Sequence, residues 1–278
     1  MNQDIRDLVE AIKKKEIILF VGAGISASLG LPTFRDLIDR IAVMLKYDPE
    51  IYNVLGDGDY LTLAEYYKIK KGSIGELRSW MDTSWHNINI RIEESRIHNL
   101  IVNLDFPIIY TTNYDRWIEK SYDYHGKNYT KIKNVEDLKD IVNGKTQIVK
   151  FHGDFDNDNS IVLTETSYFD RLSFESPLDI KLRSDTLGKG VLFIGYSLDD
   201  INIKYLLYRL TKLWEMSSRS DLRPKSFVFL PRPNQIKKEI MESRGLKVIN
   251  SEIDDLGEAT EEFLEALLNE VSQQIYTK

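Results

Sequence analysis

The chain has 278 residues, 42% of them hydrophobic and 11% aromatic, which suffices for the packed core of one large domain. Its net charge of −7 argues against direct binding of nucleic acid, and the absence of cysteine excludes disulfides and cysteine-ligated zinc. We find no amino-terminal secretory pattern and no apolar run of the ~20 residues that a membrane span needs. The sequence therefore predicts a cytoplasmic protein with no membrane partner.

The first third of the chain is expected to be mostly helical. Residues 4–14 have apolar side chains at helical spacing and predict a leading helix, and residues 17–21 form an apolar run that predicts a buried strand. A further helix is expected from Phe34 to about Met44. Residues of about 36–105 show helical patterns and no convincing strand, so we interpret them as a helical insertion, or cap, within a single domain spanning residues 1–278.

Strand patterns return in the rest of the chain. Each is a short apolar run bounded by turn residues, typical of strands buried on both faces of a parallel sheet; they cover residues 107–112, 146–151, 190–195, 226–230 and 246–250. Amphipathic helical patterns lie between several of them. This alternation predicts an α/β fold, a doubly wound Rossmann-like parallel sheet.

The turn after the first strand has the spacing of a dinucleotide-binding motif. Gly22 permits a tight turn, Gly24 lets the backbone approach a pyrophosphate, and Ala27 is small enough for close packing of helix on strand. The free backbone N–H groups of the following helix are then expected to face the anion. The motif alone is a weak signal, because an ordinary strand-to-helix turn can have the same residues.

Polar or glycine residues directly follow four of the predicted strands. In open parallel sheets, ligands bind at this place, beyond the carboxyl ends of the strands. The four groups are residues 22–26, 111–115, 152–154 and 195–200. Each group has a structural alternative. Asn113 and Asp115 can cap the next helix, His152 can be a core histidine, Ser197 and Asp200 can begin a helix, and Arg35 can be a surface cation.

Four motifs in this order resemble the sirtuin superfamily over roughly residues 17–250. They are Gly-Ala-Gly-Ile-Ser with Gly-Leu-Pro-Thr-Phe-Arg, then Thr-Thr-Asn-Tyr-Asp, then His-Gly, then Gly-Tyr-Ser. The residues of the second and fourth motifs resemble those of the bacterial defence-associated, sirtuin-like NAD hydrolases. This branch includes the effector of the Thoeris antiphage system. The resemblance implies a sirtuin-like fold and NAD+ as the substrate.

The resemblance also implies roles for the matching residues. Asn113 and Asp115 would line the nicotinamide end, and His152 would be the catalytic base. Phe34 and Arg35 would lie on a flexible loop over the nicotinamide ribose. The residues expected to bind NAD+ are Gly22, Ala23, Gly24, Ser26, Phe34, Arg35, Thr112, Gly195 and Ser197.

The chain departs from the deacylating sirtuins in three places. It lacks their four zinc-binding cysteines, so we expect no zinc module and no metal. Thr33 stands where those enzymes have an acidic residue before the Phe-Arg pair, and their Phe-Gly-Glu segment is missing. These differences argue against binding of an acyl-lysine peptide.

Three functions remain open at this point. The first is an NAD+ glycohydrolase that releases nicotinamide and ADP-ribose, or a cyclic ADP-ribose, as an antiphage or abortive-infection effector. The second is an NAD-dependent deacylase or ADP-ribosyltransferase, and the third is a non-catalytic module that senses NAD or ADP-ribose. For the first we expect control through a homo-oligomer or through a separately encoded partner, such as an ATPase or a sensor protein.

Overall fold

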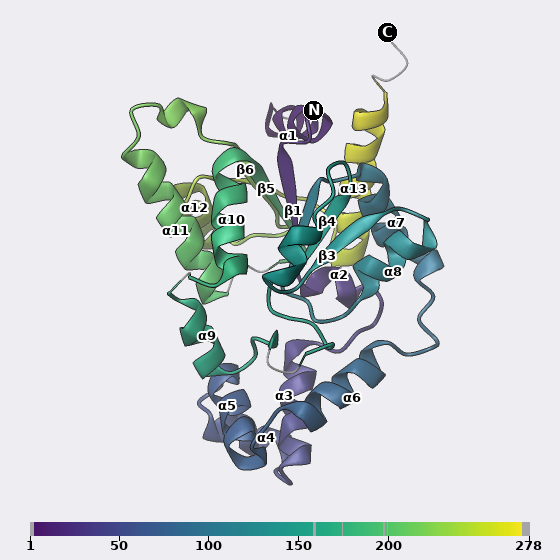
Figure 1. Ribbon diagram of the computed structural model, residues 1–278, viewed down its shortest axis with the longest axis vertical. Helices are drawn as coiled ribbons and strands as arrows, with labels where there is room; N and C mark the ends of the chain where they lie inside the picture. Colours follow the sequence, from purple (N-terminus) through teal and green to yellow (C-terminus); the bar gives the residue numbers. More distant parts are fainter. Residues whose placement is uncertain (1–2, 158–159, 174, 197, 199, 274–278) are drawn as a thin grey trace.

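The computed structural model describes residues 3–157, 160–173, 175–196, 198 and 200–273. Its centre is a parallel sheet of seven strands in the order β3-β4-β2-β1-β5-β6-β7 (Figure 1). The strands are β1 (Ile17–Val21), β2 (Ile108–Thr111), β3 (Tyr129–Ile132), β4 (Thr146–Lys150), β5 (Gly190–Ile194), β6 (Ser226–Phe229) and β7 (Leu246–Ile249). Six of them confirm the strands expected from apolar runs.

The edge strand β3 was not predicted. Its sequence is Tyr-Thr-Lys-Ile, and only Ile132 is buried, because an edge strand has a single neighbour and one open side. Continuous apolar runs indicate strands that are buried on both faces, and a half-exposed edge strand has no such run.

Helices cover both faces of the sheet, which confirms the doubly wound α/β fold. The α-helices of the described residues are α1 (Gln3–Lys13), α2 (Ala23–Ala27), α3 (Phe34–Met44), α4 (Pro49–Leu55), α5 (Tyr60–Lys71), α6 (Gly75–Trp85), α7 (Arg96–Leu104), α8 (Trp117–Tyr124), α9 (Glu165–Arg171), α10 (Pro177–Gly188), α11 (Ile201–Glu215), α12 (Gln235–Ser243) and α13 (Leu256–Ser272). Within the described residues, no helix is long and apolar enough to cross a bilayer.

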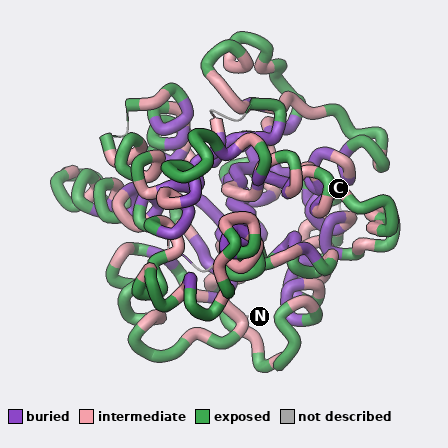
Figure 2. The backbone as a smooth tube through the Cα atoms, turned by 90° about the horizontal axis from the view of Figure 1, so that it is seen from below, coloured by how far each residue is buried: buried purple, intermediate pink, exposed green. Residues whose placement is uncertain are grey.

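Two apolar cores lie on opposite faces of the sheet. Alternate side chains of β1 enter them, since successive residues of a strand point to opposite faces. Ile17, Leu19 and Val21 pack with α1, α7, α8 and α13, whereas Ile18 and Phe20 pack with α10, α11 and α12. Figure 2 shows these central segments in purple, as buried, and much of the outer surface in green.

A third core lies beyond the carboxyl ends of the strands, where Figure 1 shows helices α3 to α6 beneath the sheet. Side chains of these helices pack against Tyr114 and Trp117, which follow β2, and against Phe155, which follows β4. Helix α7 packs on the sheet instead. Residues 36–105, all of which the structure describes, contain helices and no strand. The α3–α6 group therefore covers the edge of the sheet where a ligand site was expected.

Candidate active site

The four central strands end at the same level. Val21 of β1 pairs with Thr111 of β2 and with Ile194 of β5, and Thr111 in turn pairs with Lys150 of β4. The last residues of these strands therefore form one row, and the residues two positions later in the sequence all leave the sheet from that row. This register carries the predicted residues Ala23, Asn113 and His152 past the same edge of the sheet.

The glycine turn packs closely against the backbone after β5. A Cβ atom added to Gly22 would lie 2.4 Å from the Gly195 carbonyl oxygen, and one added to Gly24 would lie 2.9 Å from Gly195 Cα. Gly195 itself has φ +57°, where glycine is favoured, and a Cβ there would lie 2.7 Å from Ile25 N. All three glycines are therefore required by backbone packing.

The hydrogen bonds of this turn engage several of the N–H donors that the motif was expected to offer to an anion. The N–H of Gly22 donates to Ile194 O at 3.0 Å, and the N–H of Gly24 donates to Gly195 O at 2.8 Å. The N–H of Ile25 donates back to Gly22 O. These donors are used within the protein, so they do not face an anion. The exposed residues of the turn are Ala23 and Gly24.

A chain of hydrogen bonds joins three predicted residues from β1 and β2. Ser26 Oγ donates to Asp115 Oδ2 at 2.7 Å, and Asn113 Nδ2 donates to Ser26 Oγ at 2.9 Å and to Gly22 O at 3.0 Å. A carboxylate only accepts, so the Ser26 proton points to Asp115 and leaves a lone pair for Asn113. Both Nδ2 protons of Asn113 are then used in hydrogen bonds to Ser26 and Gly22. The Oδ1 atom is therefore the one that this side chain can offer to a ligand.

Asp115 also has the structural role that the sequence left open. Its Oδ1 accepts the N–H of Trp117, the first residue of α8, at 3.1 Å. The carboxylate therefore binds Ser26 through one oxygen and the start of the helix through the other. Because both oxygens are engaged, Asp115 holds the loop rigid.

A buried lysine that the sequence analysis missed lies behind this loop. Lys150 of β4 is fully buried; its ammonium group donates to the Asp115 carbonyl and lies 3.5 Å from Glu119 Oε1. The signal was present, since Lys150 stands between the apolar residues Val149 and Phe151 at the end of a buried strand, and a buried lysine needs a partner. The partner itself comes from α8 and was not identifiable from the sequence.

His152 lies in an aromatic environment after β4. It is 2% exposed, its ring stacks on Phe151 at 5.7 Å, and it meets the Tyr168 ring edge-on at 5.4 Å. Burial lowers the pKa of His152 to about 4, although the nearby Asp200 carboxylate opposes this shift. His152 is therefore neutral at physiological pH and able to accept a proton.

Phe34 and Arg35 are not on a loop. They form the first turn of α3, because Thr33 caps this helix: its Oγ1 accepts the Asp36 N–H, and the Asp36 carboxylate accepts the Thr33 N–H at 2.7 Å. Both side chains are exposed, and Phe34 packs on Tyr60 at 5.7 Å. Thr33 thus has a capping role where the deacylating sirtuins have an acid.

The remaining predicted residues have fewer contacts. Thr112 is half-buried beside Asn113, and Ser197 lies outside the described residues. Asp200 caps α11, with its Oδ1 accepting the N–H groups of Asn202 and Ile203. Throughout the described part of the chain, no group of three or more acidic or histidine side chains is placed to hold a metal ion.

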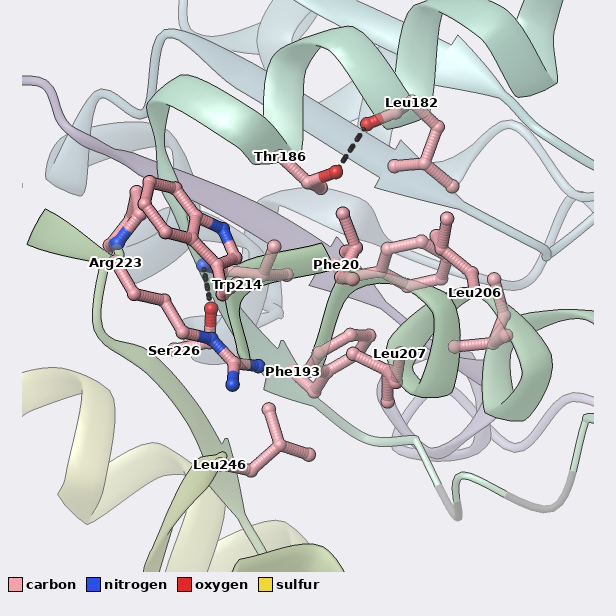
Figure 3. A pocket seen from close by; sticks show the side chains of 14 residues that line it. Phe20, Leu182, Thr186, Phe193, Leu206, Leu207, Trp214, Arg223, Ser226 and Leu246 are labelled. Carbon is pink, nitrogen blue, oxygen red and sulfur yellow. Dashed lines mark hydrogen bonds between the residues drawn. The ribbon is translucent and has the colours of Figure 1, made fainter. Parts of the chain in front are cut away.

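An apolar cavity lies elsewhere, between the sheet and helices α10 and α11 (Figure 3). Phe20, Phe193 and Leu207 line it, with Trp214 and Arg223 close by. Its volume of 20 Å³ holds about one water molecule. It is a packing void of the core and is too small for a nucleotide.

The fold and these strand-end residues define a doubly wound α/β protein with its candidate site at the carboxyl edge of a parallel sheet. The family model of the SIR2-like domain matches residues 107–249, half of the chain. The chain therefore belongs to the SIR2-like family, which confirms the resemblance to the sirtuin superfamily.

Individual relatives agree with this assignment. The chain is 33% identical over 207 residues to an Enterococcus faecium protein named NAD(+) hydrolase ThsA, covering 73% of this chain and 41% of that protein. A Cytobacillus dafuensis protein of the same name is 30% identical over 217 residues (78% and 42%). The Bacillus subtilis defense-associated sirtuin 2 is 27% identical over 259 residues (89% and 24%). The chain thus spans less than half the length of these relatives.

A crystal structure of a SIR2 homologue in complex with NAD is also similar to this chain. It covers 96% of this chain and 95% of its own, with 12% identity and a TM-score of 0.49.

Proposed function

We propose that this chain is an NAD+ glycohydrolase that cleaves the bond between nicotinamide and ribose. The observation that carries the proposal is that a fixed amide, Asn113, and a buried neutral histidine, His152, follow the level ends of adjacent strands. Curated relatives named NAD(+) hydrolase support it. NAD+ is then the substrate, and no metal is required.

Features of the described residues fit a dinucleotide at this edge. Gly22 and Gly24 let the turn after β1 pack against the backbone of Gly195, and Ala23 and Gly24 are exposed there. His152 Nε2 is buried and has no hydrogen-bond partner in the described part of the chain. The Asp200 carboxylate lies 3.4 Å from this nitrogen, so the other ring nitrogen is the one left for a ribose hydroxyl or a water molecule. Arg35, Phe34, Thr112, Gly195 and Ser197 stay proposed contacts of the substrate.

Cleavage of this bond builds positive charge on the ribose, and the nicotinamide leaves as a neutral molecule. The protein therefore needs a group to position the nucleophile and a base, and it needs no general acid. Asn113 Oδ1 accepts a hydrogen bond from the attacking water or a ribose hydroxyl and orients it. His152 accepts the proton, and the Asp115 carboxylate favours the developing charge.

The biological setting is proposed from the relatives. Their names include a defense-associated sirtuin, and we propose that this chain serves as an antiphage or abortive-infection effector in the cytoplasm. Unregulated hydrolysis of NAD+ would harm the host, so the activity requires control. We propose that control comes from a homo-oligomer, from a separately encoded ATPase or sensor protein, or from both.

The decisive experiment is NAD+ consumption by the purified protein, with separation of nicotinamide, ADP-ribose and cyclic ADP-ribose. We expect turnover in the wild type and its loss in Asn113→Ala and His152→Ala. His125→Ala is the matched control, since this histidine lies at the end of α8, and it should retain full activity.

Turnover that survives both site substitutions would contradict the proposal. NAD+ binding without turnover, also in the presence of candidate partner proteins, would instead favour a sensing module.

A further inference from the structure

One carboxylate outside the predicted site faces the proposed base. Asp200 Oδ2 lies 3.4 Å from His152 Nε2, and the side chains of the two residues are 9% and 3% exposed. Nε2 has no hydrogen-bond partner among the described residues. The buried edge of the imidazole ring is therefore directed at a negative charge.

Asp200 is held in place independently of His152. Its Oδ1 accepts the N–H groups of Asn202 at 2.8 Å and Ile203 at 3.1 Å, which caps α11. Its Oδ2 also accepts from the Tyr168 hydroxyl at 3.4 Å. The helix and Tyr168 thus fix the direction of Oδ2, so the carboxylate can orient the histidine.

The other charges near His152 neutralise one another. Arg171 of α9 binds Asp179 of α10 through two nitrogens, with its Nε 3.0 Å from Oδ2 and its Nη2 2.5 Å from Oδ1. Arg171 also donates to the Phe151 carbonyl at 2.8 Å. Because this pair is compensated, Asp200 is left as the effective charge acting on the imidazole.

We propose that Asp200 is a positioning residue for His152: its Oδ2, 3.4 Å from Nε2, favours the tautomer with the proton on Nε2, which leaves Nδ1 as the nitrogen that takes a proton in the reaction. In a neutral histidine the hydrogen bond made by one nitrogen decides which nitrogen carries the proton. Asp200 also stabilises the imidazolium that forms when His152 accepts a proton. This role in catalysis rests on the proposed function, whereas the tautomer of His152 does not.

The substitution Asp200→Asn tests this role while it keeps the helix cap. Asparagine caps helices as well as aspartate does, and its Oδ1 can accept the same two N–H groups. Its Nδ2 then replaces Oδ2 and donates to His152 Nε2, which forces the proton onto Nδ1. We expect kcat to fall by about 100-fold or more, with little change in KM.

The matched control is Asp255→Asn. Asp255 caps α13 through the Glu258 N–H at 2.8 Å, so this variant makes the same chemical change at a helix start remote from His152. It should leave kcat unchanged. Both variants should melt within a few degrees of the wild type.

A second readout is independent of turnover. The chain has four histidines, so the ¹⁵N imidazole signals of His152 can be assigned by their loss in His152→Gln. We expect the Nε2–H tautomer in the wild type and the Nδ1–H tautomer in Asp200→Asn. An Nδ1–H tautomer in the wild type, or the same tautomer and kcat in both proteins, would overturn the proposal. If the wild type lacks turnover also in the presence of candidate partner proteins, the proposed function fails, and the tautomers still decide this inference.

Discussion

The two halves of the candidate site differ in how their polar groups are satisfied. On the β1–β2 side, Ser26, Asn113 and Asp115 bind one another at 2.7 to 2.9 Å, and Lys150 supports the loop from behind. In the other half, formed by residues that follow β4 and β5, His152 is buried, but its Nε2 has no hydrogen bond within the described residues. Its surroundings are aromatic rings and the Asp200 carboxylate.

This difference indicates a division of labour. The β1–β2 half is pre-organised, since each hydrogen bond in it determines the direction of the next. The other half, formed by residues that follow β4 and β5, holds the base His152 beside the Asp200 carboxylate, ready to take a proton when substrate and water arrive. Rigid positioning and proton transfer are thus assigned to two different groups of residues beyond the strand ends.

The largest effect is expected for Asn113→Asp, which is nearly equal in size to the natural residue. Its second oxygen would face Gly22 O and Ser26 Oγ, where two N–H donors now lie, and it would add a negative charge beside Asp115. We expect kcat to fall by about 10³-fold, as for Asn113→Ala. Steady-state NAD+ hydrolysis measures it, with Asn103→Asp on the exposed side of α7 as the control. Activity near that of the wild type would show that the amide donors are dispensable.

A smaller loss is expected for Ser26→Ala, which removes the link between Asn113 and Asp115. Both partners lose a hydrogen bond but stay in place through Gly22 O and the Trp117 N–H. We expect kcat to fall by about 10- to 100-fold, since a small misplacement of a catalytic group has a cost of this order. Ser28→Ala is the control in the same region, because Ser28 donates only to Ile25 O in the described contacts. Equal activity of the two variants would argue that the β1–β2 half is not pre-organised by this chain of bonds.

The smallest effect is expected for the dependence of kcat/KM on pH. A base acts in its neutral form, and burial lowers the pKa of His152 to about 4, so the neutral form dominates above that pH. We expect kcat/KM for NAD+ to stay nearly constant between pH 8 and pH 5, and to fall only as pH approaches 4. An acidic limb centred near ~6.5, the value of a free histidine, would mean that His152 is not held in an apolar environment during catalysis.

Much of this molecule was predictable from local pattern. The six buried strands, the glycine turn and the helices that begin near Phe34 and after Asp200 follow from apolar runs and from capping residues. The strand β3 was missed because Lys131 and Thr130 interrupt its apolar character at an edge. Phe34 and Arg35 were expected on a loop, whereas the Thr33–Asp36 capping box makes them helical.

The sequence by itself determined the parallel α/β fold, the family resemblance, and the position of each polar residue just beyond a strand. These are properties of short segments, because apolar periodicity and turn chemistry act over a few neighbouring residues. Only the tertiary structure decided which of these residues meet. Ser26 and Asp115 are 89 positions apart in the sequence, and the register of β1 on β2 brings them together. The pairing of Lys150 with Glu119 depends on α8, and that of His152 with Asp200 depends on the start of α11. Hydrogen-bond direction and burial arise from such long-range packing, and for that reason the structure, and not the motif, separates the positioning residues from the base.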